Sequence, residues 1–299
     1  MRIRASHPLS LLVEVTVSAV FLGTVAGCGS LKEADGGTEV LAHRVQKVAA
    51  AWDGSTAAAT WRAGYHPMGD VIELPRGGLR SKADKQAYED QSFVLRGELP
   101  ATRPQEGRVA WAEGESLTRP LAGVDESYKA LAGAHDEGRP HLTVTRAKLG
   151  EMTLATSRGP ATAPAWLFTL EGYASPLKRA AAIPSKLPPP PIRRARDVPG
   201  YPLHRLVQIA ADGRSVTVVA LHGVCDDGPM VDVLETRGSV VLSASVKSRQ
   251  NGGYCTKQGK LQEVTVKLDR PVGDRVLLDA HTGQPIPYKP PHGPSPSWS

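Results

Sequence analysis

The sequence predicts an α+β protein, mainly β, with an N-terminal α+β domain (residues 45–182) and a C-terminal domain like an antiparallel β-sandwich (203–286). Three observations lead to this prediction. Helical spacing of apolar residues occurs only in the first half of the chain, short alternating segments fill the last third, and a proline-rich stretch (183–202) separates the two. A hydrophobic fraction of 40% over 299 residues is enough for two packed cores.

In the N-terminal domain, the apolar spacing predicts a helix over 45–52 that ends at Asp53-Gly54. Residues 125–135 predict a second helix, with Asp125 as its capping residue. Residues 141–172 alternate between apolar and polar side chains, and we expect three strands of an antiparallel meander there.

In the C-terminal domain, alternating segments pair around three turns, with the sequences ADGR, TRGS and RPVGD. Alternation with a period of two buries one face of each strand. Six or seven short strands at intervals of about 8–12 residues favour an antiparallel sandwich or a small barrel.

Two proline-rich segments flank this domain. Residues 183–202 contain four consecutive prolines and predict an extended spacer or a strap between the domains. Residues 287–299 form a proline-rich tail.

The N-terminus has the three parts of an export signal over residues 1–27: a short basic region, an apolar run and small residues before Cys28. The apolar run is shorter than the roughly 20 residues that a membrane-spanning helix needs. The sequence VAGC at 25–28 resembles a bacterial lipobox, which implies that Cys28 is diacylated and becomes the first residue of the mature chain. Residues 28–44 are polar, and we expect a lipidated tether.

The formal net charge of +6 allows contact with an anionic envelope polymer or with another envelope protein. The basic residues are scattered, and aromatic residues do not alternate with them, so nucleic acid is not an expected partner. Once Cys28 carries lipid, Cys225 and Cys255 remain as one pair. Outside the cell we expect them to form a disulfide.

Residues 221–228, LHGVCDDG, hold the densest group of reactive side chains. Asp226 and Asp227 are candidate Ca²⁺ ligands, but the same residues are common in turns between strands. The sequence contains no second cysteine or histidine pair with zinc-ligand spacing, and no cofactor is expected because the P-loop and dinucleotide fingerprints are absent.

Catalysis has no strong motif either, since G-x-S-x-G and H-E-x-x-H do not occur. Glu171 lies at a predicted strand end, His204 follows the proline-rich stretch, and Asp227 lies in a turn. These three are the candidate catalytic residues if the protein is an envelope hydrolase with its active site between the two domains.

Three segments carry a family resemblance: APAWLFTLEG (163–172), CDDG (225–228) and DRVLLDAHTGQPIPY (274–288). With them the chain resembles lipoproteins of high-GC actinobacteria of the streptomycete type. The resemblance implies strands, turns and one cysteine pair, and it transfers no catalytic residue. We therefore expect a protein anchored by lipid to the outer face of the cell membrane, with a binding or envelope-interaction role rather than an enzymatic one.

Overall fold

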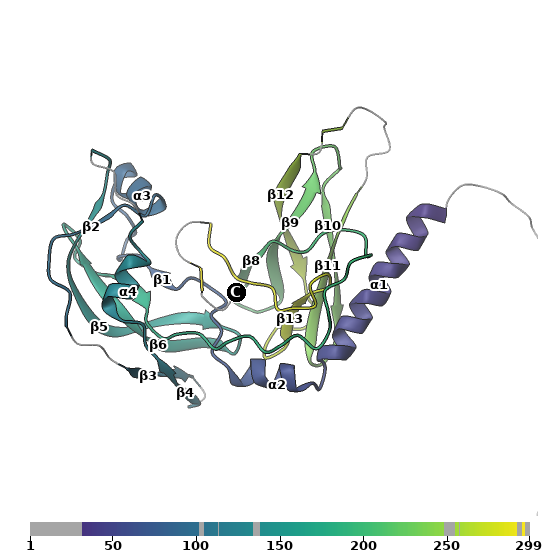
Figure 1. Cartoon of the computed structure of the whole chain (residues 1–299), viewed down its shortest axis with the longest axis horizontal. Helices are drawn as coiled ribbons and strands as arrows, with labels where there is room; N and C mark the ends of the chain where they lie inside the picture. Colours follow the sequence, from purple (N-terminus) through teal and green to yellow (C-terminus); the bar gives the residue numbers. More distant parts are fainter. Residues whose placement is uncertain are drawn as a thin grey trace, which may run out of the picture.

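The computed structural model describes residues 32–101, 105–112, 114–133, 138–247, 255–256, 258–291 and 295–296. The protein is α+β, mainly β, as the sequence predicts. It has two lobes, each with its own hydrophobic core, and Figure 1 shows them side by side. The predicted signal peptide (1–27) and Cys28 lie outside the described residues.

The first lobe is built on a seven-stranded sheet. Strands β2 and β5 extend it on one edge of β6, and the other edge of β6 pairs with both β7 and β3. Strand β1 then pairs with β7, and β4 pairs with β3. The strands are β1 (Ile72–Glu73), β2 (Phe93–Leu95), β3 (Glu106–Trp111), β4 (Ser116–Pro120), β5 (Leu142–Thr156), β6 (Gly159–Leu170) and β7 (Leu177–Ala180).

The predicted three-stranded meander is one long hairpin instead. Strands β5 and β6 pair antiparallel from Val144 to Thr156, so residues 142–156 form one strand where two were expected. Gly150 is a strand residue whose lack of a side chain makes room for its neighbour, because a Cβ atom there would lie 2.8 Å from a methyl group of Leu167.

Two short helices, α3 (Lys82–Glu89) and α4 (Val124–Lys129), belong to the first lobe. Helix α4 is shorter than the predicted helix over 125–135. Gly123 is its N-cap and makes no side-chain cap, so the prediction that Asp125 caps this helix is wrong. Val124 is buried and draws the first turn into the core one residue earlier.

The second lobe contains two three-stranded sheets that share one core. One has the order β10-β11-β13 and the other β12-β9-β8. The strands are β8 (Arg205–Ile209), β9 (Ser215–Gly223), β10 (Pro229–Glu235), β11 (Ser239–Val246), β12 (Gly259–Lys267) and β13 (Val276–Asp279).

This sandwich is not wholly antiparallel, because β13 pairs parallel with β11. The chain crosses from one sheet to the other between β12 and β13, so the two strands around RPVGD lie in different sheets. After this crossover, β13 joins the edge of the other sheet next to β11 and runs parallel to it.

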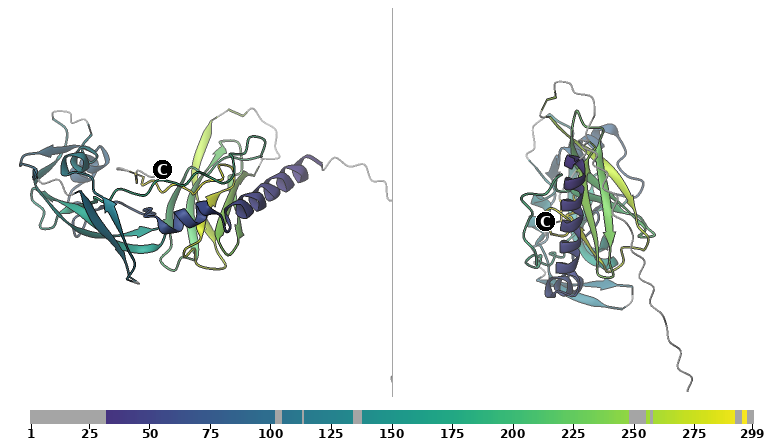
Figure 2. Two further views of the ribbon diagram at one scale, coloured as in Figure 1. Left: turned by 60° about the horizontal axis from the view of Figure 1, so that its bottom comes forward. Right: turned by 90° about the vertical axis from the view of Figure 1, so that its right-hand side faces the viewer.

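Helices α1 (Lys32–Trp52) and α2 (Thr56–Ala63) pack on this second lobe, although the sequence placed residues 45–63 in the first domain. Figure 2 shows α1 running along the sandwich. Residues 32–44 are helical and do not form the predicted tether, because the apolar stripe that contains Val45, Val48 and Trp52 continues back to Leu41. The helix ends before Gly54, as predicted; this glycine has a φ of 72°.

Two segments cross between the lobes and are hydrogen-bonded to each other. The first (residues 64–71) leads from α2 to β1, and the second (residues 181–204) leads from β7 to β8. The Tyr65 N–H donates to Ser185 Oγ (3.0 Å), and the Ser185 N–H donates to the Tyr65 carbonyl (2.8 Å). A further tie joins the Tyr288 hydroxyl to a carboxylate oxygen of Asp70 at 2.5 Å. The proline-rich segment beyond residue 185 lies against the second lobe, where the Ala195 N–H donates to the His281 carbonyl (2.8 Å).

Candidate functional site

A cleft of about 570 Å³ lies between the two lobes. Its lining is mostly apolar and comes from segments far apart in the sequence: α2, the residues after it, β3, the β5–β6 turn, the β8–β9 turn and the segment that leads into β13. The lining includes Trp61, Met68, Trp111, Glu115, Thr156, Arg158, Ala211, Asp274, Arg275 and Leu277. We call this cavity the interlobe cleft.

The first-lobe wall is organised around Trp111 at the end of β3. Its indole Nε1–H donates to Thr156 Oγ1 at 3.0 Å, which fixes the ring orientation. The Thr156 hydroxyl in turn donates to the Gly159 carbonyl at 2.6 Å. Thr156 pairs with Gly159 across a two-residue hairpin turn, and Gly159 has a φ of 90° that suits glycine.

A cation covers this indole ring. The guanidinium carbon of Arg158 lies 3.9 Å from the ring centroid of Trp111, within the range of a cation–π interaction. Arg158 also forms an ion pair with Glu115. Arg158 is thus held on the Trp111 face, and its charge is already partly balanced at the edge of the cleft.

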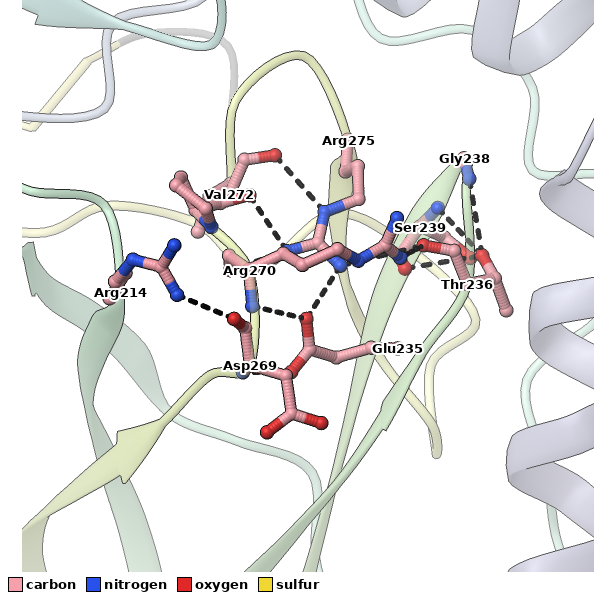
Figure 3. Close-up of polar contacts among 10 residues, drawn as sticks. Arg214, Glu235, Thr236, Gly238, Ser239, Asp269, Arg270, Val272 and Arg275 are labelled. Atoms are coloured by element: carbon pink, nitrogen blue, oxygen red, sulfur yellow. Dashed lines mark hydrogen bonds and ion pairs between the residues drawn. The ribbon is translucent and has the colours of Figure 1, made fainter.

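The second-lobe wall is a segment fastened by a buried ion pair, drawn in Figure 3. Arg275 Nη1 donates to Glu235 Oε2 at 2.7 Å, and the two side chains are only 5% and 12% exposed. Arg275 Nη2 donates to the carbonyls of Arg270 and Pro271, both at 2.7 Å. The segment 270–275 is therefore tied to the end of β10 and to itself.

Glu235 receives further hydrogen bonds in this network. The Asp269 N–H donates to its Oε1 at 2.6 Å and the Arg270 N–H to its Oε2 at 3.4 Å. Burial by itself raises the pKa of Glu235, but the hydrogen bond from Arg275 and those from the two backbone N–H groups outweigh it. The pKa of this carboxyl group is consequently lower than its ordinary value.

The remaining wall comes from α2 and the crossing segment. The Trp61 ring stacks on His66 with 4.0 Å between centroids and 6° between planes. Burial, helped by the positive charge of Arg119, lowers the pKa of His66 to about 4, so this ring is neutral at neutral pH. The Met68 N–H donates to the Ala155 carbonyl (2.9 Å) and so holds the first crossing segment, between α2 and β1, against β5.

This arrangement is suited to binding. Two indole rings, a methionine and a leucine belong to the apolar lining and are each less than 10% exposed, and the charged side chains at the edge form ion pairs, such as Asp274 with Arg62 at 4.0 Å. Among the described residues that line the cleft there is no histidine and no cysteine.

The three candidate catalytic residues do not line the cleft. Glu171 follows β6 and forms an exposed ion pair with Arg96 at 3.1 Å. His204 precedes β8 and lies in a different cavity, beside Lys289. Burial lowers the pKa of His204, and the charges of Lys289 and Arg205 lower it further. Asp227 lies between β9 and β10, where its N–H donates to the Lys247 carbonyl.

The stretch LHGVCDDG forms the end of β9 and the turn after it. Cys225 and Cys255 form a disulfide with 5.8 Å between their Cα atoms, the pairing that cysteine counting predicts. Asp226 Oδ2 accepts the Gly223 N–H at 2.6 Å, so this carboxylate shapes the turn. Within the described part of the chain, no three His, Cys, Asp or Glu side chains are placed to hold a metal ion, and this includes Asp226 and Asp227.

Sequence reasoning did not identify Trp61, Trp111, Arg158 or Leu277 as site residues. Two of the chain's five tryptophans line the cleft, but indole rings also fill cores, as Trp52 and Trp166 do. The one local signal is TSRG (156–159), a hairpin turn that presents an arginine.

Comparisons with known proteins do not identify this chain: no protein-family model, no curated protein and no solved structure matches it. No helix within the described residues has the length and apolar character needed to cross a membrane.

Proposed function

We propose that this protein is a lipid-anchored, extracytoplasmic binding protein that takes a small, mainly apolar ligand into the interlobe cleft. The observation that carries the proposal is the cleft itself: about 570 Å³ between two separate cores, with the indole rings of Trp61 and Trp111 on its walls. Ligand sites in proteins are typically concave and mainly apolar, with a few placed polar groups, and they lie preferentially between domains.

The walls support this role because contacts within the protein hold them in place. Trp111 is oriented by Thr156 and covered by Arg158, and Arg275 fastens the opposite segment. A preformed site loses less conformational entropy when it binds. Since Arg158 and Arg275 already have carboxylate partners, the cleft favours an apolar ligand over an anionic envelope polymer.

A cleft-filling variant tests the binding proposal. Ala211 is exposed and lines the cleft on the β8–β9 turn, so Ala211→Trp places a large side chain in the cavity. With the neutral apolar dye N-phenyl-1-naphthylamine, we expect saturable binding to the wild type and at least about tenfold weaker binding to Ala211→Trp, which corresponds to about 1.4 kcal/mol.

The matched control is Ala174→Trp, which adds the same side chain at an exposed alanine outside the cleft. Its dye affinity should equal that of the wild type. Equal weakening by both substitutions, or unchanged binding by Ala211→Trp, would refute the cleft as the binding site.

The anchor is tested separately at Cys28. The lipobox-like VAGC motif and the export signal support acylation of this cysteine, and two acyl chains hold a protein on a membrane where one chain does not. In the native host, Cys28→Ala should move the protein from the membrane fraction into the medium or into the detergent-free soluble fraction. Cys28→Ala protein that stays with the membrane would contradict the lipid anchor.

A further inference from the structure

A second cavity, separate from the interlobe cleft, lies between α4, β7, the two crossing segments and residues 295–296 near the C-terminus. It has a volume of about 340 Å³. Much of its lining is small and apolar, including Ala122, Ala130 and Pro184. Three of its polar side chains, Tyr65, Ser127 and Arg179, come from three different parts of the chain.

The donor atoms of these three residues are buried without protein partners. The Tyr65 hydroxyl, the Ser127 hydroxyl and two guanidinium nitrogens of Arg179, Nε and Nη1, make no hydrogen bond within the described residues. Tyr65 is 0% exposed and Ser127 is 1% exposed. Buried polar groups in proteins are nearly always hydrogen-bonded, so three such groups around one cavity require an explanation.

The chemistry of the three groups specifies the missing partner. An arginine can only donate hydrogen bonds, and the two hydroxyls can each donate one. A ligand that satisfies all three must therefore present acceptor oxygens, and the positive charge of Arg179 favours a negative one. Burial raises the pKa of the Tyr65 hydroxyl, which therefore keeps its proton and can donate.

One acidic group shares this cavity. Glu126 lines it, and its negative charge acts on Arg179. Burial nevertheless lowers the pKa of Arg179, because the negative charge of Glu126 offsets only part of the loss of water around the guanidinium. Glu126 also repels a bound anion, which selects against multiply charged ligands such as phosphate.

From these contacts we propose that the cavity around Tyr65, Ser127 and Arg179 binds the carboxylate of a small organic acid. The carboxylate oxygens accept from the two hydroxyls and the guanidinium, and the alanine and proline walls contact the short apolar part. This site does not depend on the interlobe cleft, because no residue lines both cavities.

Isothermal titration calorimetry of the full chain with sodium propionate tests the proposal, with sodium chloride at equal ionic strength as the blank. We expect saturable binding to the wild type. Tyr65→Phe and Ser127→Ala, which each delete one hydroxyl, should weaken it several-fold, and Arg179→Ala should abolish it. Glu126→Gln should tighten it, because the substitution removes a repelling charge.

Two measurements keep the proposal falsifiable if a variant folds poorly. The control Arg76→Ala removes an exposed arginine outside the cavity and should bind propionate as the wild type does. Without propionate, Tyr65→Phe should leave the melting temperature unchanged or raise it, since it removes an unpaired buried hydroxyl. No heat of binding in the wild type, or a Tyr65→Phe variant that melts lower yet binds propionate normally, would overturn the site. Failure here would leave dye binding in the interlobe cleft unaffected.

Discussion

At the scale of single residues, the Arg275–Glu235 pair is the contact with the largest expected effect on stability. Both side chains are nearly buried, and both have further hydrogen bonds to the backbone. Removing one member of a buried pair leaves the other charge uncompensated, which typically costs several kcal/mol, whereas exposed pairs contribute little.

We therefore expect Glu235→Gln to lower the free energy of unfolding by about 3 kcal/mol in chemical denaturation. The control Glu171→Gln makes the same change in the exposed pair with Arg96, and its effect should stay below about 1 kcal/mol. Similar losses in the two variants would show that burial of the Arg275–Glu235 pair does not matter.

The same pair gives a pH dependence whose sign follows from the lowered pKa of Glu235. A carboxyl group with a lower pKa in the folded chain stabilises it fully above its unfolded pKa, close to 4.5, and loses that contribution as the pH falls through the folded pKa. The difference in unfolding free energy between wild type and Glu235→Gln should be constant above pH 4.5 and shrink below it. A difference that grows on acidification would contradict this assignment.

At the scale of elements, the disulfide joins the turn after β9 to the segment before β12. The chain between Cys225 and Cys255 includes β10 and β11, which lie in the other sheet of the sandwich. The bond therefore closes a loop of 30 residues whose two strands, β10 and β11, belong to one sheet, while its two ends are next to β9 and β12 of the other. Its main effect is to restrict the unfolded chain.

The double variant Cys225→Ser, Cys255→Ser should lose about 3–4 kcal/mol of stability. Reductant should lower the melting temperature of the wild type toward that of the variant and leave the variant unchanged, as measured by circular dichroism. If the wild type, unfolded and refolded in reductant, kept its original melting temperature, the disulfide would not have this stabilising role.

Comparing the predicted and observed elements shows which features of the fold local sequence patterns can predict. Four strands of the second lobe follow from their turns, because ADGR connects β8 with its antiparallel neighbour β9 and TRGS connects β10 with β11. The pattern does not say which sheet a strand joins, and β13 enters the sheet opposite β12. It also does not say what covers an apolar helix face. The stripe of α1 predicts burial but not that the second lobe buries it.

At the scale of the whole molecule, the candidate site exists only because two lobes meet. Trp61, Trp111 and Leu277 come from α2, β3 and β13, and no local pattern places these residues together. The residues that looked reactive in the sequence have structural roles: Asp226 accepts a hydrogen bond within a turn, and Cys225 forms the disulfide. Local patterns predicted some elements of this fold, such as β6 and the strands of the second lobe, while the site depends on long-range packing that they do not encode.

Binding in the interlobe cleft is tested most directly by an NMR titration of the full chain with N-phenyl-1-naphthylamine that follows its methionine methyl and indole N–H signals. Met68, Trp61 and Trp111 line the cleft, and the Cε methyl signal of the methionine and the indole N–H signals of the two tryptophans should shift together and saturate. The signals of the buried Trp166 and of Met230, which is 46% exposed on the sandwich, should stay in place. Saturable shifts at Met230 with none at Met68, Trp61 and Trp111 would place the ligand elsewhere and contradict the account.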